Sequence, residues 1–76
     1  MEVWVLEEYY PDEGISETLG VFENLDVGLN SVNIHENIIW NENEYGTYWE
    51  SNRVNDIIYH LKKFEVVLDE MPIIKD

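Results

Sequence analysis

Residues 2–22 read EVWVLEEYYPDEGISETLGVF, and this stretch decides the fold. Both odd and even positions of residues 2–10 carry apolar side chains, so an extended chain here has apolar groups on both faces. Pro11 presets a turn that Gly14 closes, which predicts a β-hairpin with strands at 2–10 and 15–22. The first strand is then either covered on two sides or has one face left for a partner. Its two faces are Val3, Val5 and Tyr9 on one side and Trp4, Leu6 and Tyr10 on the other.

The composition beyond this hairpin also favours strands. The chain has no Ala or Gln, while Val and Ile together number 16. One helix of about two to three turns is predicted within residues 23–32, capped by Asn24 and weakened by Gly28. Its apolar stripe consists of Phe22, Leu25, Leu29 and Val32. In the second strand, Ile15, Leu19 and Val21 are expected on one face, with Ser16 and Thr18 on the other.

The remaining residues predict a second hairpin and a closing strand. Residues 34–51 contain strand-like runs at 38–40 and 47–49, with a turn at 41–46. Residues 53–63 fit both a helix and a strand, and their β-branched and aromatic content favours a strand from about 57 to 68, with a bulge near Lys62 and Lys63. The fold class is α+β: a small antiparallel sheet of four or five strands and one short helix, in the order ββαβββ. We expect a single domain over residues 1–76, with a loose tail at 70–76.

The charge is large and unevenly placed. The 76 residues hold 17 Asp and Glu against 4 Lys and Arg, a formal charge of −13. Residues 1–52 carry twelve of the acids and no Lys or Arg, so all four bases lie in residues 53–76. A small domain ordinarily keeps its net charge to roughly 2–8 in magnitude. The acids therefore either keep an aromatic-rich domain in solution or attract a basic partner.

Several classes of protein are excluded or disfavoured. Without Cys there is no disulfide framework or thiolate zinc site. Phosphates and anionic lipids would meet charge of their own sign, so we expect neither direct nucleic-acid binding nor a membrane contact. The acidic start of the chain lacks the basic region of a signal peptide, which predicts a cytoplasmic protein.

No motif for catalysis or metal binding stands out. No serine lies in a signature that would place it on a sharp turn beside His35 or His60. The adjacent His35 and Glu36 are the nearest approach to a metal pair, and such a pair is more often a solvated loop. We expect no enzymatic activity, no cofactor and no metal site.

Three segments resemble small uncharacterised proteins of bacteria and their phages. They are residues 3–7 (VWVLE), 19–25 (LGVFENL) and 64–66 (FEV). Those proteins open with a strand hairpin, pass through a Gly-Val-Phe strand end into a short helix, and close with a strand. The resemblance implies a ββα fold followed by strands, and a bacterial or phage-infected cell in which accessory and counter-defence proteins are frequent. It carries no functional residues across, and the segment 33–52 departs from the pattern.

Acidic side chains are interleaved with aromatic ones in two places, and these are the candidate partner-binding residues. Tyr and Trp are the anchors that protein interfaces favour. Alternate residues of a strand lie about 6.6 Å apart on one face, so acids there imitate a row of phosphates. The turn cluster consists of Glu7, Glu8, Tyr10, Asp12 and Glu13, and the hairpin cluster consists of Glu42, Glu44, Tyr45, Tyr48, Trp49 and Glu50. Trp4, Phe22 and Phe64 are expected in the core instead.

These features lead us to expect an acidic inhibitor that occupies a basic surface of a nucleic-acid-handling protein. The partner is a basic host or cognate protein, as for a phage counter-defence protein, an immunity protein or an antitoxin. The alternative is a non-catalytic assembly module, in which a strand edge pairs with another chain and the acids only provide solubility. A homodimer is compatible with either hypothesis.

Overall fold

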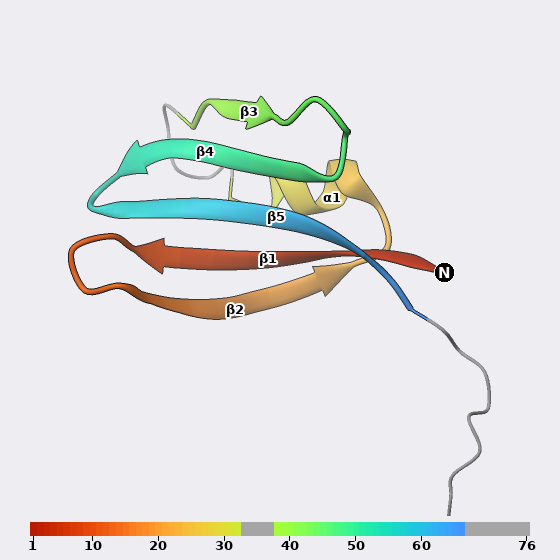
Figure 1. The fold of residues 1–76 in the computed structure, drawn as a ribbon, viewed down its shortest axis with the longest axis horizontal. Coiled ribbons are helices and arrows are strands. Elements are labelled where there is room, and N and C mark those ends of the chain that lie inside the picture. Colours follow the sequence, from red (N-terminus) through yellow and green to blue (C-terminus); the bar gives the residue numbers. More distant parts are fainter. Residues whose placement is uncertain (33–37, 67–76) are drawn as a thin grey trace, which may run out of the picture.

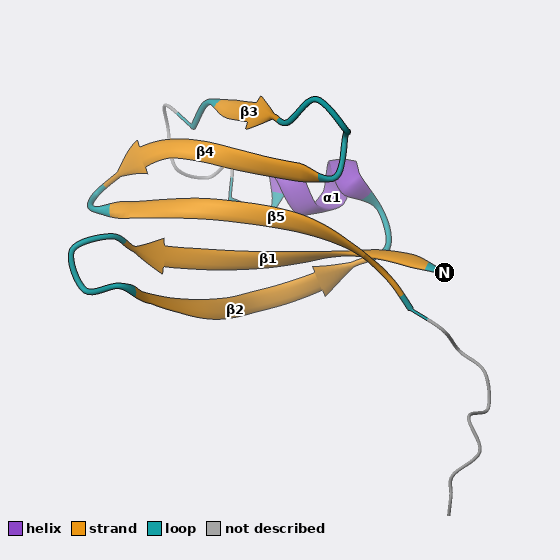
Figure 2. Cartoon of the chain, in the orientation of Figure 1, coloured by secondary structure: helices purple, strands orange, loops and turns teal. Residues whose placement is uncertain are grey.

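The chain forms one five-stranded antiparallel sheet with a short helix on one side (Figures 1 and 2). The computed structural model describes residues 1–32 and 38–66. The elements are β1 (Glu2–Tyr10), β2 (Ile15–Phe22), α1 (Leu25–Asn30), β3 (Trp40–Glu42), β4 (Tyr48–Val54) and β5 (Ile57–Glu65). The order across the sheet is β2-β1-β5-β4-β3. The predicted α+β class and the ββαβββ order are confirmed, while the predicted tail at 70–76 lies outside the described residues.

The first hairpin is formed as predicted. The backbone N–H groups of Glu13 and Gly14 donate to the carbonyl oxygen of Tyr10 at 3.1 and 2.8 Å. Gly14 has a φ of 69°, a conformation that glycine adopts without steric cost. The local turn signal therefore fixes both the position of the turn and the pairing of β1 with β2.

The predicted face pattern of β2 is wrong because the strand contains a bulge. The pairing of β1 with β2 shifts between Leu6 and Glu7, which leaves Leu19 as an extra residue on β2. An extra residue reverses the alternation beyond it. Val21 consequently lies on the same face as Thr18, and not opposite to it as strict alternation predicts.

Helix α1 begins where the sequence predicts and is shorter than expected. The side-chain oxygen of Asn24 accepts hydrogen bonds from the N–H groups of Asp26 and Val27 at 2.8 and 3.3 Å. The helix has 6 residues, so it completes less than two turns. A Cβ atom at Gly28 would lie 3.1 Å from Cδ2 of Leu61. Glycine at this position therefore lets the helix backbone lie directly on the sheet.

Residues 53–63 form the end of β4, a tight turn and most of β5, so the strand alternative is confirmed. Asn55 and Asp56 in the turn have φ values of 53° and 67°, as in the two-residue turns that match the twist of a hairpin. The pairing shift lies between Glu50 and Arg53 on β4, and the expected bulge near residues 62–63 is absent from the described register. Residues 67 and 68 of the predicted strand lie outside the described residues.

The second hairpin is present with different boundaries. Strand β3 begins at Trp40, so Ile38 and Ile39 precede it and do not belong to it. Strand β4 begins at Tyr48 and continues to Val54, beyond the predicted end. Residues 34–37 of the predicted hairpin segment 34–51 lie outside the described residues.

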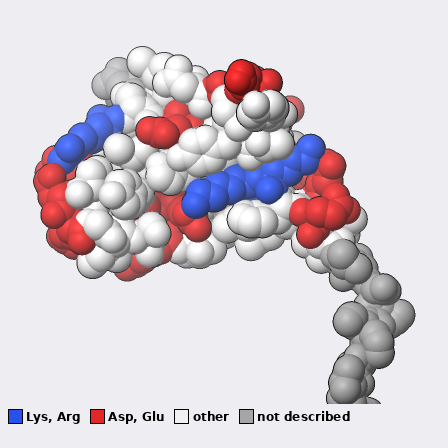
Figure 3. All heavy atoms as spheres, viewed as in Figure 1, with Lys and Arg blue, Asp and Glu red and all other residues white. Residues whose placement is uncertain are grey.

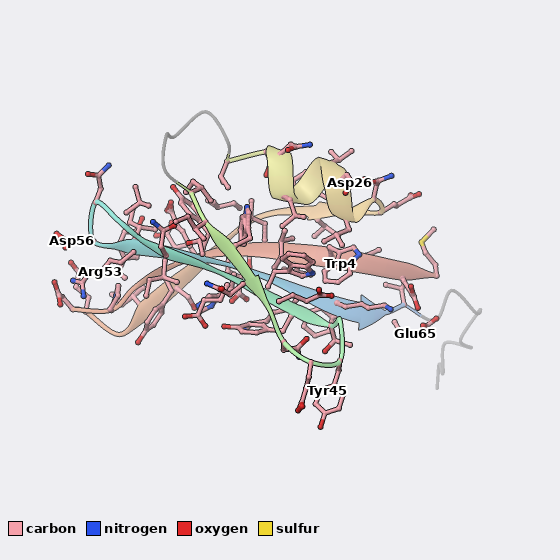
Figure 4. The ribbon with its side chains drawn as sticks, turned by 90° about the horizontal axis from the view of Figure 1, so that it is seen from above. Trp4, Asp26, Tyr45, Arg53, Asp56 and Glu65 are labelled. Carbon is pink, nitrogen blue, oxygen red and sulfur yellow. The ribbon has the colours of Figure 1, made fainter. Side chains whose placement is uncertain are left out.

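The core lies between α1 and one face of the sheet. The contacts of α1 are with β1 and β2, and Leu61 of β5 is fully buried beneath it. Phe64 was expected in the core but is 49% exposed, because it alternates with Leu61 and faces the other way. We call that other face the open face, since no described element covers it (Figure 4). The buried cluster is Trp4, Leu6, Val32, Tyr59 and Leu61, with Phe22, Leu25, Leu29, Ile38, Trp40, Trp49 and Ile57 packed against it.

Candidate protein-binding surface

The open face brings together side chains that are far apart in the sequence. His60 of β5 lies between Glu7 of β1 and Glu50 of β4 in the strand register. Figure 3 shows this face, with acidic atoms at its ends and along its upper part, basic atoms across the middle, and uncharged side chains between them. The register thus joins one residue of the turn cluster to the hairpin cluster.

A row of three rings crosses the middle of the open face. The rings of Tyr9 and His60 are stacked with centroids 5.7 Å apart, and the ring of Tyr48 lies 5.4 Å from His60 in a tilted arrangement. The hydroxyl of Tyr48 donates to Glu50 at 3.2 Å. Burial, the negative charge of Glu50 and this hydrogen bond raise the pKa of Tyr48 to about 12. The phenol therefore stays protonated and holds the Glu50 carboxylate beside the ring.

Each base in the described part of the chain is already paired with a carboxylate. Lys62 lies 3.2 Å from Glu7, and Lys63 lies 3.2 Å from Glu2. The guanidinium of Arg53 bridges Asp12 at 3.0 Å and Asp56 at 3.1 Å, joining the β1–β2 turn to the β4–β5 turn. Such partly exposed pairs each contribute about 0–1 kcal/mol to stability. Their main electrostatic effect is to neutralise the acids nearest the bases.

The turn cluster does not form one continuous surface. Glu7 lies on the open face, whereas Glu8 and Tyr10 lie on the α1 side of the sheet. Tyr10 donates to Glu8, and this hydrogen bond raises the pKa of Tyr10 to about 12. Asp12 is paired with a base, and Glu13 is exposed at the tip of the turn.

The hairpin cluster is close along the chain but is divided between the two faces: Tyr48 and Glu50 lie on the open face, and Glu42, which pairs with Trp49, lies on the α1 side. Within residues 1–32 and 38–66, no base lies within 4.0 Å of Glu42, Glu44 or Glu50. Tyr45 is 78% exposed and projects on the side of the sheet opposite α1 (Figure 4). Trp49 instead packs against the core, with its indole nitrogen buried. The accessible part of the cluster therefore consists of the three carboxylates with Tyr45 and Tyr48.

Four residues of this surface are absent from the candidate clusters. Tyr9 and His60 form the row of rings together with Tyr48. For Tyr9, the alternation of side chains along the first strand was the signal in the sequence. Asn41 and Asn43 lie among the acids of the hairpin, and together with Tyr48 they line an open hollow of about 310 Å³. The sequence around His60 did not indicate a place on this surface, because the residues beside His60 in the sheet come from β1 and β4.

The position of His60 predicts a pH dependence of stability. Burial lowers the pKa of His60 below 6.5, opposed by the charges of Glu50 and Glu7 and reinforced by that of Lys62. The unfolded chain then binds a proton near pH 6.5 that the folded chain does not bind. Stability should consequently fall as the pH drops below 6.5 and stop falling on this account below the folded pKa. Chemical denaturation at pH 7.5 and 5.5, compared with a His60→Gln variant, isolates this contribution from those of the carboxylates.

An NMR titration of the His60 imidazole provides the direct check. A pKa of 6.5 or higher for the His60 imidazole in the folded protein contradicts the prediction. Equal loss of stability in wild type and His60→Gln between the two pH values also contradicts it.

Ser51 serves the pairing of the strands. The hydroxyl of Ser51 donates to the carbonyl oxygen of Asn52 at 2.7 Å and accepts from the N–H of Tyr59 at 2.8 Å, so it is committed to the sheet. No three His, Asp or Glu side chains within the described ranges form a group that fits a metal ion. Across the same ranges, none of the helical structure has the length and apolar character needed to span a membrane.

No protein-family model, curated protein or solved structure matches this chain.

Proposed function

We propose that this chain is a non-catalytic, cytoplasmic inhibitor that binds a basic protein and covers the surface on which that protein binds nucleic acid. The class is that of phage counter-defence proteins, immunity proteins and antitoxins. The β3–β4 hairpin and the adjoining open face form the binding surface. The partner is a protein, because direct contact with nucleic acid would oppose charges of the same sign.

One observation carries the proposal. Each Lys and Arg of the described chain forms an ion pair within the molecule, and none of these pairs involves a carboxylate of the hairpin cluster. Glu42 and Glu44 are exposed at the tip of the sheet and Glu50 is held beside Tyr48. An excess of unpaired carboxylates attracts a basic surface and speeds its association. The net charge of −13 makes this attraction long-ranged at low salt.

The aromatic side chains supply the contact that charge alone does not. Tyr45 is exposed over 78% of its surface, and Tyr is one of the residues that protein interfaces favour. The ring row lies on the same side of the sheet. Buried rings lengthen the lifetime of a complex, since most affinity differences between related complexes arise in dissociation.

The test is capture of a partner at low salt followed by competition. The partner retained from host-cell extract is identified by mass spectrometry and then purified. Its affinity should fall steeply as salt is added, and duplex DNA or structured RNA should displace it. A partner that binds nucleic acid and this chain at the same time contradicts the proposal.

Charge reversal on the hairpin locates the interface. The Glu42→Lys/Glu44→Lys variant should bind the purified partner at least about tenfold more weakly at low salt. The matched control is Glu17→Lys/Glu23→Lys, which makes the same change of net charge at two exposed positions away from the hairpin. Equal weakening in both variants would show that only total charge matters and would reject the hairpin as the interface.

A second candidate rests on the edge strand β2. Ile15, Leu19 and Val21 of this strand are 49%, 46% and 60% exposed, and an edge strand presents unpaired backbone groups. Pairing of β2 with another copy would make an assembly module. Sedimentation distinguishes the two functions, because edge pairing gives a stable oligomer that persists in high salt. The bulge at Leu19 opposes such pairing, since bulges protect edges.

A further inference from the structure

The two faces of the sheet differ in charge as well as in cover. Among the side chains of the strands, the open face has two acids and two bases: Glu7, Glu50, Lys62 and Arg53. The α1 side has five acids and one base: Glu2, Glu8, Glu17, Glu42, Glu65 and Lys63. The strands therefore give the open face no net charge of its own, although the whole chain carries −13.

The two bases of the open face neutralise the acids nearest to them. Lys62 lies 3.2 Å from Glu7, across the middle of the face (Figure 3). Arg53 holds the carboxylates of both turns at the end of the sheet, at 3.0 and 3.1 Å. A second molecule with the same large negative charge thus meets less repulsion on this face than on the α1 side.

Apolar side chains lie beside these ion pairs. Val21 of β2 pairs with Val5 of β1, and Phe64 of β5 lies on the same face, one position along the sheet. We call Val5, Val21 and Phe64 the apolar strip. Val21 and Phe64 are 60% and 49% exposed, and Val5 is partly buried. The ring row continues this uncharged surface towards β4, as the white area of Figure 3 shows.

The second layer of the fold covers only one side of the sheet. Domains ordinarily bury a sheet face against another layer, and here that layer is a helix of 6 residues on β1 and β2 (Figure 4). An antiparallel sheet tolerates one face in water when that face is polar. The open face is not of this kind, because the apolar strip and the ring row occupy it.

We propose that two copies of this chain pack open face against open face as a homodimer, a two-layer β-sandwich with one α1 helix on each outer side. The inference goes beyond the proposed function and does not depend on it. A two-fold axis places the same surface patch on both copies, so the patch has to complement itself. A face with balanced charge and an apolar strip meets that condition, whereas the acidic α1 side does not.

The size of the face fits a weak dimer. Strands β1, β2, β4 and β5 have 9, 8, 7 and 9 residues. At about 3.3 Å per residue and about 4.8 Å between strands, they cover roughly 500 Å² in projection. Two copies then bury roughly 1,000 Å², the lower limit for a specific interface. Because the net charges still repel, we expect a reversible dimer with a dissociation constant on the order of 100 µM.

Sedimentation equilibrium of the full chain tests the dimer. The average mass should rise from monomer towards dimer between about 10 µM and 1 mM protein. Raising NaCl from about 0.05 to 0.5 M should strengthen the dimer at least about threefold, because salt screens the repulsion between like charges. If another segment of the same chain or only a basic partner covers the face, the protein stays monomeric at every concentration, which overturns the inference. A dimer that weakens with salt also overturns it.

Polar substitutions on the two faces locate the contact. Phe64→Gln should weaken the dimer at least about tenfold, since each copy loses an apolar contact. Val21→Thr keeps the shape of the side chain and should weaken it about threefold to fivefold. The matched control is Ile15→Thr, because Ile15 is β-branched, lies on the same strand and is 49% exposed, but pairs with Tyr10 on the α1 side.

The control also separates face packing from pairing at the β2 edge. Ile15→Thr should change the dimer less than about twofold, as is usual for a substitution outside the contact. Thermal melting of dilute samples shows that each variant keeps its fold. Filtered NMR experiments on mixed labelled and unlabelled chains should give contacts between copies at residues 5, 21 and 64. Equal effects of Val21→Thr and Ile15→Thr, or contacts confined to the β2 backbone, would overturn the inference.

The dimer and the inhibitor proposal fail in different ways. Both complexes use the open face, so a basic partner should compete with dimerisation, and salt should affect the two complexes in opposite directions. A chain that stays monomeric yet binds the partner rejects only the dimer. A dimer that persists in the partner complex, or a partner that still binds nucleic acid there, rejects only the inhibitor proposal.

Discussion

Replacing Leu61 with alanine is expected to lower the free energy of unfolding by about 2–5 kcal/mol, the range for large-to-small changes in a core. Leu61 has 0% exposure, lies in the centre of the sheet, and approaches the backbone of α1 at Gly28. Stabilities of about 0.05–0.15 kcal/mol per residue leave a chain of this size only several kcal/mol in total. The variant should therefore be partly or wholly unfolded at 37 °C. Urea denaturation followed by tryptophan fluorescence measures the loss.

Phe64→Ala provides the matched comparison for Leu61. Phe64 belongs to the same strand, is apolar and is 49% exposed on the open face. Its removal should cost about 1 kcal/mol or less, as is usual for surface positions. A loss at Phe64 as large as that at Leu61 contradicts the placement of the core on the α1 side.

Ser51→Ala is expected to lower stability by about 1–3 kcal/mol, because it leaves a buried backbone group without its partner. Ser51 is 3% exposed and sits where the pairing of β4 with β5 shifts. Its hydroxyl accepts from the N–H of Tyr59 at 2.8 Å, in place of a backbone carbonyl. The amide proton of Tyr59 should lose protection from exchange in the variant, which hydrogen-exchange NMR detects.

Ser16→Ala on the exposed strand β2 is the control for Ser51. This variant removes the same hydroxyl at a solvent-facing position and should change stability by less than about 0.5 kcal/mol. Unchanged protection of the Tyr59 amide in Ser51→Ala would mean that the hydroxyl does not serve the pairing shift.

The parts of the fold that depend on local signals could be predicted from the sequence. The Pro11–Gly14 turn and the cap at Asn24 are fixed by neighbouring residues, and both are found where expected. The bulge at Leu19 could not be foreseen, because it depends on how β2 meets β1. The Asn55-Asp56 turn carried a hairpin signal, but the apolar spacing around it also fitted a helix.

The candidate surface was harder to predict than the fold. The sequence identified the acids and rings of the β3–β4 hairpin, which lie close together along the chain. It could not assign His60, whose neighbours Tyr9 and Tyr48 come from different strands and depend on non-local register. Trp49 was assigned to the binding surface, but it packs on the core. An aromatic residue in a strand suits either face, so the sequence could not distinguish the two.

The position of β1 between β2 and β5 also determines when the molecule can fold. As the chain leaves the ribosome, β1 and β2 emerge as a lone hairpin, which is marginal in water by itself. The middle of the sheet closes only after residues 57–65 have been synthesised and have found β1. Such distant pairing raises the contact order and slows folding compared with helical proteins of the same length. Strand β1 therefore completes its pairing only when β5 is available, and the sheet assembles only once nearly all of its residues have been translated.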